Sequence, residues 1–239
     1  MGEPVEEPSN TVFYLKVYNN VTHVNLIGIL TSSMLAFGSC SFMNVQTVTL
    51  LQDSFDVPKD DVGRVSAKIL TWAYVFSIFS ALTAGYIYDI FGRRITITLT
   101  LLLTAGCMII LPITIPSLFL FCILKTCIDS LYTATASLPL IVDYVRPQDH
   151  GKAASLYGLG AVLGEAVAMT TVIVFSSLPG SVCVPLFGMG LAGLSVLNYF
   201  TIREREDITG YPARMQEEAD EFAALSKCDK LKALTSESW

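Results

Sequence analysis

The sequence predicts an all-α membrane protein with six transmembrane helices. Its 239 residues are 52% hydrophobic and only 15% charged, whereas a soluble domain averages about 25% charged residues. Six apolar stretches each reach the roughly 20 residues that a helix needs to cross a bilayer. They do not alternate between polar and apolar residues as the strands of a membrane barrel do. Helices also satisfy their own backbone hydrogen bonds in lipid, so the spans are predicted as helices.

The first 21 residues are acidic and contain Pro4 and Pro8. They lack the basic region and the small-residue cleavage site of a signal peptide. We therefore expect residues 1–21 to be a cytosolic N-terminal segment, and the first apolar run to be retained as a span. The membrane domain is expected over 22–202, with spans at about 24–45, 66–88, 95–115, 117–144, 152–176 and 182–202.

The charges of the connections predict the orientation. The connection 46–65 is the only long loop expected between spans, and it carries four acids and two bases, while those around 112–116 and 177–185 carry no charge. The bases on the opposite side are Arg93, Arg94, Arg146, Lys152, Arg203 and Arg205. Short basic connections stay in the cytosol. We therefore expect both termini to be cytosolic; the identity of the membrane is left open.

The composition becomes polar after residue 202. Residues 203–239 are expected to form a cytosolic tail with a short helix, because Pro212 suits the first position of a helix. Acids come early in this segment and lysines late, an order that complements the helix dipole.

Three ionisable residues lie inside predicted spans, where charge is costly. Lys125 and Asp129 are four residues apart on the fourth span, so they share a helix face and can pair. Glu165 lies near the middle of the fifth span. One interpretation is a cluster that binds substrate or protons in a central cavity. The other is a structural ion pair, with Glu165 satisfied by neighbouring serine or threonine groups.

The first span has a polar face. Ser33, Phe37, Ser41 and Asn44 recur at helical spacing, so they lie on one side. This face could line a cavity, or its serine and asparagine could bond to a neighbouring helix. Small residues of the fifth span, including Gly160 and Gly164, indicate close helix packing.

A short charged connection, residues 85–94, separates the second and third spans. It places Asp89 close to two adjacent arginines, between two apolar runs. Asp143 lies near the end of the fourth span, on the same predicted side of the membrane. A carboxylate–guanidinium pair there would be partly shielded and stronger than a surface ion pair.

This connection carries a recognisable motif. It reads Gly85-x-x-x-Asp89-x-x-Gly92-Arg93-Arg94. The motif, in its place between spans two and three, resembles the loop motif of the major facilitator superfamily. Asp143 followed by Arg146 resembles the family's equivalent connection between spans four and five. The resemblance covers about residues 22–202, so the fold is expected to resemble one half of a major facilitator-type bundle.

The resemblance implies a secondary transporter that works by alternating access around a central site. It implies that Asp89, Arg93 and Asp143 form a cytosolic charge network that stabilises the outward-facing state. It also places Lys125 near a membrane arginine that is linked to proton coupling in exchangers.

The chain departs from the family pattern in three respects. Ile90 replaces the usual base after the acid, and Asp129 lies where many members have glycine. The family has twelve spans in two six-helix halves, whereas one half is expected here. We therefore expect a half-length transporter of a small solute, or a fragment of one, that pairs as a homodimer or with a separate second half within the lipid bilayer.

The alternative function is a non-transporting membrane scaffold or regulatory subunit that retains the fold. An enzyme is not expected: a rhomboid-type protease needs a membrane histidine, and His23 and His150 lie near span ends. No CxxC pair occurs among the six cysteines, so neither a metal nor another cofactor is predicted. Basic patches with interleaved aromatics are absent from the sequence, so no nucleic-acid partner is expected. The substrate, the coupling ion and the direction of transport are left open.

Overall fold

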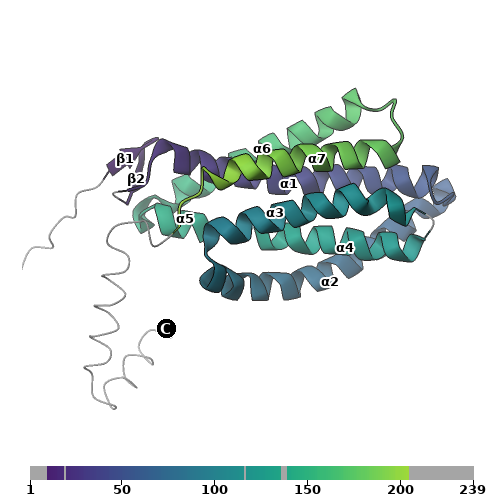
Figure 1. Ribbon diagram of the computed structural model, residues 1–239, viewed down its shortest axis with the longest axis horizontal. Coiled ribbons are helices and arrows are strands. Elements are labelled where there is room, and N and C mark those ends of the chain that lie inside the picture. Colours follow the sequence, from purple (N-terminus) through teal and green to yellow (C-terminus); the bar gives the residue numbers. More distant parts are fainter. Residues whose placement is uncertain (1–9, 19, 116, 136–138, 205–239) are drawn as a thin grey trace, which may run out of the picture.

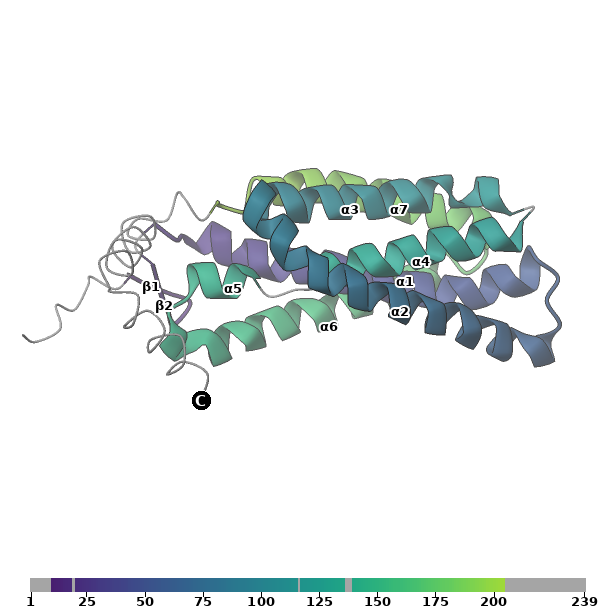
Figure 2. The ribbon, with the colours of Figure 1, turned by 90° about the horizontal axis from the view of Figure 1, so that it is seen from below.

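The computed structural model describes residues 10–18, 20–115, 117–135 and 139–204. Six helices within these ranges are long and apolar enough to cross a membrane. Figures 1 and 2 show them running along a common direction as an elongated bundle. The predicted all-α membrane fold is confirmed. The helices of the bundle are α1 (His23–Asp53), α2 (Lys59–Phe91), α3 (Arg93–Ile110), α4 (Leu118–Thr135), α6 (His150–Val174) and α7 (Gly180–Tyr199).

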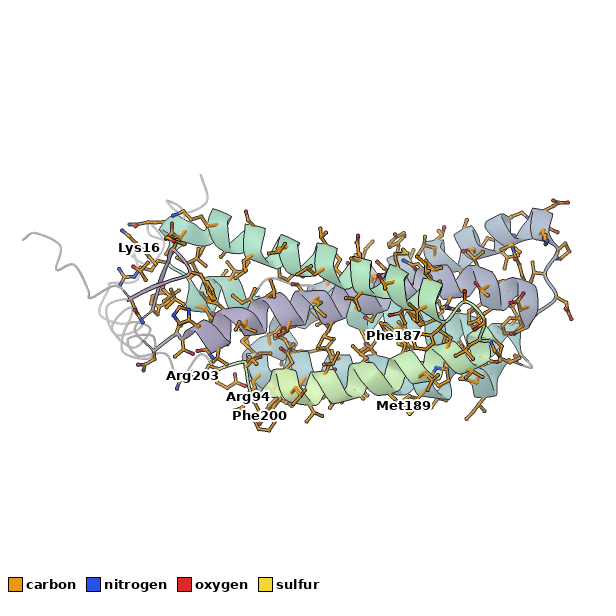
Figure 3. All side chains as sticks on the ribbon, turned by 90° about the horizontal axis from the view of Figure 1, so that it is seen from above. Lys16, Arg94, Phe187, Met189, Phe200 and Arg203 are labelled. Atoms are coloured by element: carbon orange, nitrogen blue, oxygen red, sulfur yellow. The ribbon has the colours of Figure 1, made fainter. Side chains whose placement is uncertain are left out.

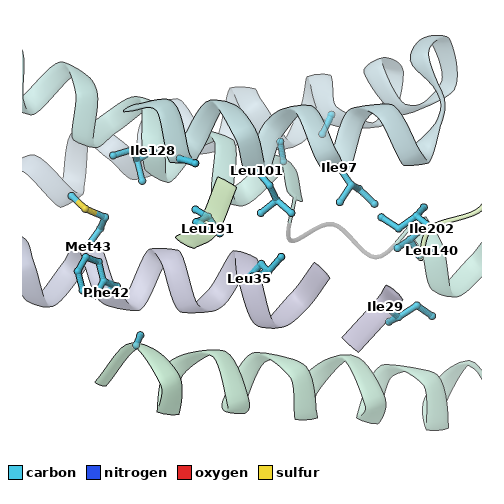
Figure 4. Packing of buried hydrophobic residues seen from close by; sticks show 14 of the residues in the cluster. Ile29, Leu35, Phe42, Met43, Ile97, Leu101, Ile128, Leu140, Leu191 and Ile202 are labelled. Atoms are coloured by element: carbon cyan, nitrogen blue, oxygen red, sulfur yellow. The ribbon is translucent and has the colours of Figure 1, made fainter. Parts of the chain in front are cut away.

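Helix α1 is the central element of the bundle. It contacts each of the other five long helices and packs most extensively against α6, while α3 pairs mainly with α7 and α2 with α4. Its buried side chains join one hydrophobic cluster with those of its neighbours. Figure 4 shows Leu35 of α1, Leu101 of α3, Ile128 of α4 and Leu191 of α7 within this cluster.

Two glycines of α6 allow its close approach to α1. A Cβ atom on Gly164 would lie 2.1 Å from the Met34 carbonyl oxygen, and one on Gly160 would lie 2.4 Å from the Leu30 carbonyl oxygen. Neither separation is sterically possible, so only glycine fits at these positions. The close packing predicted from the small residues of the fifth span is present here.

The prediction of a long loop over 46–65 is wrong. Helix α1 continues to Asp53 and α2 starts at Lys59. Gln46 and Thr47 are polar, but both are buried against the bundle, so they do not end the helix. Only residues 54–58 form the connection between the two helices. Both helices therefore extend beyond the apolar windows from which the spans were predicted.

A β-hairpin precedes α1 that the sequence did not predict. Strands β1 (Asn10–Val12) and β2 (Leu15–Val17) pair in antiparallel fashion, and their Val12, Leu15 and Val17 side chains are buried. Val17 forms a bridge with Val145, after the fourth span. The hairpin lies at the end of the bundle that holds Gly92–Arg94, which we call the arginine end (Figure 1).

Two helices are described within the fourth predicted span, α4 (Leu118–Thr135) and the short helix α5 (Pro139–Tyr144). Two 3-10 helices, η1 (Leu111–Thr114) and η2 (Pro147–Asp149), flank the longer elements. The tail helix predicted beyond residue 204 lies outside the described residues.

Candidate functional site

Arg93 connects three segments at the arginine end. Its Nε donates to Asp143 Oδ2 at 2.8 Å, and its Nη1 donates to Asp89 Oδ1 at 3.1 Å. Asp143 is 3% exposed and Asp89 is 66% exposed. The shielded pair with Asp143 is therefore the stronger one, because exposed ion pairs contribute only about 0–1 kcal/mol. The three residues implied by the motif do meet, but they do not contribute equally.

Glu204 is a further member of this cluster, and the sequence analysis missed it. Its two carboxylate oxygens accept the backbone N–H groups of Arg93 at 2.9 Å and Arg94 at 3.0 Å. These N–H groups open α3 and have no partner inside the helix. A carboxylate at a helix N-terminus is also favoured by the helix dipole. Glu204 therefore joins the end of the sixth span to the start of the third.

Gly92 makes this arrangement possible. Its φ is +81° and its ψ is 167°, a conformation that is essentially restricted to glycine. A Cβ atom there would lie 2.5 Å from the Glu204 Oε2 atom. Gly85 differs, because a Cβ atom there would meet nothing within 4 Å. Within this chain, the motif therefore requires glycine only at Gly92.

The other residues of the motif region have separate roles. Arg94 Nε donates to the Tyr199 carbonyl oxygen at 2.8 Å, and its guanidinium lies 3.7 Å from the centroid of the Tyr199 ring. Figure 3 shows Arg94 beside the end of α7. Arg146 is half-buried, and its backbone N–H donates to the Lys16 carbonyl oxygen of the hairpin at 3.0 Å. Ile90, in place of the usual base, is exposed.

A second polar group lies at mid-depth between α1 and α4. Lys125 Nζ donates to both carboxylate oxygens of Asp129, at 2.5 and 2.7 Å, and to Asn44 Oδ1 at 2.9 Å. Lys125 is 2% exposed and Asp129 is 6% exposed. The two charges therefore compensate each other, and Asn44 extends the group to α1.

Glu165 lies apart from this pair. It is exposed on α6. Among the described residues, no ion pair or hydrogen bond involves its side chain. Within the described residues, neither a serine nor a threonine side chain bonds to Glu165, as the second of the two interpretations would have required.

The predicted polar face of α1 divides into two parts. Ser33 is buried, and its hydroxyl donates to the Leu30 carbonyl oxygen of its own helix at 2.9 Å. Phe37 is half-buried, with its ring 5.3 Å from Tyr132 and 5.9 Å from Tyr157, both edge to face. Ser41 and Asn44 line an open hollow of about 500 Å³ between α1 and α6. Ser33 is thus buried in helix packing, while the other three residues are half-buried or exposed. They lie on the side of the bundle formed by α1, α4 and α6, which we call the open side.

Six helices long and apolar enough to cross a membrane, with ionisable groups between their ends, define a multi-pass membrane domain. The chain belongs to the Major Facilitator Superfamily, whose family model matches residues 22–235. It is therefore an integral, multi-pass membrane protein of the major facilitator type, and members of this family are transporters of small solutes rather than enzymes. No curated protein matches the chain by sequence.

Proposed function

We propose that this chain forms one six-helix half of a secondary transporter, or is part of such a protein, and that it moves a small solute by alternating access. The solute path runs along the open side of α1, α4 and α6. The observation that carries the proposal is Glu165, an exposed carboxylate in the middle of a membrane span that has no partner within the part of the chain that the structure describes. Intramembrane ionisable groups generally face a cavity or a partner and serve function.

The energetics favour a second unit over this face. A charged side chain at the centre of a bilayer costs about 2.5 kcal/mol or more. Asn44 is also exposed on the same side. A second copy of the chain, or a separate second half, would enclose these groups in a polar path rather than in lipid, as the two halves of the family's transporters do.

The cluster at the arginine end supports a gating role. Arg93 joins Asp89 of α2 to Asp143 of α5, and the N-terminus of α3 is held by Glu204. We propose that this end is cytosolic, together with both chain termini. Contacts made in only one state of a transporter set the balance between its two states. Weakening the cluster is expected to shift that balance away from the outward-facing state.

Solute flux tests the transport proposal. The purified chain is reconstituted into vesicles and assayed with a panel of radiolabelled amines, amino acids, sugars and organic anions, with and without a proton gradient. We expect uptake of at least one solute, lost in Glu165→Gln and altered in Asp89→Asn. An exposed acid far from the path, Asp61→Asn, serves as the matched control. A folded chain that carries no member of the panel would instead favour the scaffold function.

The oligomeric state tests the second unit. Native mass spectrometry of the chain released from its own membrane is expected to show a dimer or a complex with a companion chain. A stable monomer alone would contradict the proposed pairing.

A further inference from the structure

Three aromatic rings from three different helices pack against one another through Phe37. Phe37 of α1 lies between Tyr132 of α4 and Tyr157 of α6, with ring centroids 5.3 and 5.9 Å away. All three side chains are half-buried, so each keeps part of its surface accessible. Aromatic ring faces carry partial negative charge and attract cations.

The electrostatic balance of this region is negative. Lys125 is held by Asp129 and Asn44, so it contributes no uncompensated positive charge. Glu165 is exposed on α6 and has no such partner among the described residues. One uncompensated negative charge therefore remains on α6, the helix that also carries Tyr157.

Space for a ligand adjoins this charge. The hollow between α1 and α6 is about 500 Å³ and is lined by Ser41, Asn44 and Met169, among others. Met169 lies one helical turn beyond Glu165, so the two share a face of α6. Phe37 likewise precedes Ser41 by one helical turn of α1, so Phe37 and Glu165 each lie one turn from a residue that lines the hollow.

Other solute classes fit these groups less well. An organic anion needs an uncompensated cation, and Lys125 already binds three oxygen atoms. A sugar needs many hydrogen-bonding partners, whereas the polar side chains that line the hollow are only Ser41, Asn44 and Thr49. A proton alone needs the carboxylate but gives the aromatic rings no role.

We propose that this site binds a monovalent organic cation of the ammonium type, with Glu165 as its counter-ion and the Phe37, Tyr132 and Tyr157 rings as its aromatic wall. The inference rests on the proposed function, because it takes the open side of α1, α4 and α6 as the solute path. It adds the charge and the chemical class of the solute.

Binding of choline to the purified full chain tests the proposal. The matched probe is 3,3-dimethylbutan-1-ol, which has the shape of choline but no charge. Equilibrium dialysis with radiolabelled choline is expected to show saturable binding, with the uncharged probe competing at least about tenfold more weakly. Tetraethylammonium is expected to displace choline, and benzoate is not.

Three variants and one control assign the binding energy to residues. Glu165→Gln is expected to weaken choline binding about tenfold or more, while Glu165→Asp keeps the charge and most of the affinity. Phe37→Leu is expected to weaken binding about threefold or more. Asp61→Asn removes a remote acid and should leave binding unchanged. Circular dichroism and thermal unfolding verify that each variant is folded.

Several outcomes would overturn the inference: no saturable binding of choline or tetraethylammonium, equal competition by the uncharged probe, or full affinity in Glu165→Gln. Because binding needs no flux, the two proposals fail separately. Flux of a sugar or an anion without cation binding would overturn this inference and leave the transport function intact. Cation binding without any flux would overturn the transport function alone.

Discussion

The Lys125–Asp129 pair offers a sharp test of how the mid-depth polar group is held. In Lys125→Met, the Asp129 carboxylate loses its only ionic partner among the described residues, in a site where it is 6% exposed. Asn44 Oδ1 loses its donor in the same variant. Breaking a buried pair from one side costs about 3–5 kcal/mol. We therefore expect Lys125→Met to be strongly destabilised.

The double variant separates pairing from packing. Replacement of a buried pair by apolar residues of similar volume is often neutral or stabilising. Lys125→Met combined with Asp129→Leu should therefore lose much less stability than the two single variants together, with a coupling energy of about 2 kcal/mol or more. Reversible unfolding in detergent micelles, measured on all four proteins of the cycle, gives this coupling. Additive single effects would refute a mutually compensating pair.

Four further substitutions test the arginine end and the packing of α6 by the same unfolding measurement. Asp143→Asn should lower the free energy of unfolding by about 1.5–3 kcal/mol because Asp143 is buried, while Asp89→Asn should lower it by at most about 0.5 kcal/mol. Equal effects would contradict the conclusion that the Arg93–Asp143 pair is the stronger of the two ion pairs. Gly92→Ala should lower the free energy of unfolding by about 1–3 kcal/mol because φ at this residue is +81°. Unchanged stability would show that the fold does not require this backbone conformation. Gly164→Val should separate α1 from α6 and prevent stable folding, so a native-like midpoint would contradict the close approach.

The helical spans were predictable because each apolar run is long and the membrane allows few alternatives. The ends of the helices were less predictable. Gln46 and Thr47 read as loop residues, yet they are buried in α1. Burial depends on neighbouring helices, which local composition does not describe. The β-hairpin was missed for a related reason: its strands have only three residues each, and Val17 gains its partner Val145 from a distant part of the chain.

The candidate site was predictable where a motif or a helical spacing carried it. The Lys125–Asp129 pair follows from a four-residue spacing, and the Arg93–Asp143 pair from the motif and the topology. Glu204 was not predictable, because its contact with the start of α3 joins residues 111 positions apart. The aromatic wall was missed as well, because Tyr132 and Tyr157 meet Phe37 only through the packing of three helices.

Water access to position 165 tests the central claim most directly. In a variant without native cysteines, Glu165→Cys is exposed on native membranes to a charged, membrane-impermeant thiol reagent. Met189→Cys is the matched control, because Met189 is exposed on α7, another span, as Figure 3 shows. A solute path predicts rapid labelling at position 165, slowed by bound solute, and little labelling at position 189. Equal lack of reaction at both positions would place Glu165 in lipid or in a sealed contact and contradict the account.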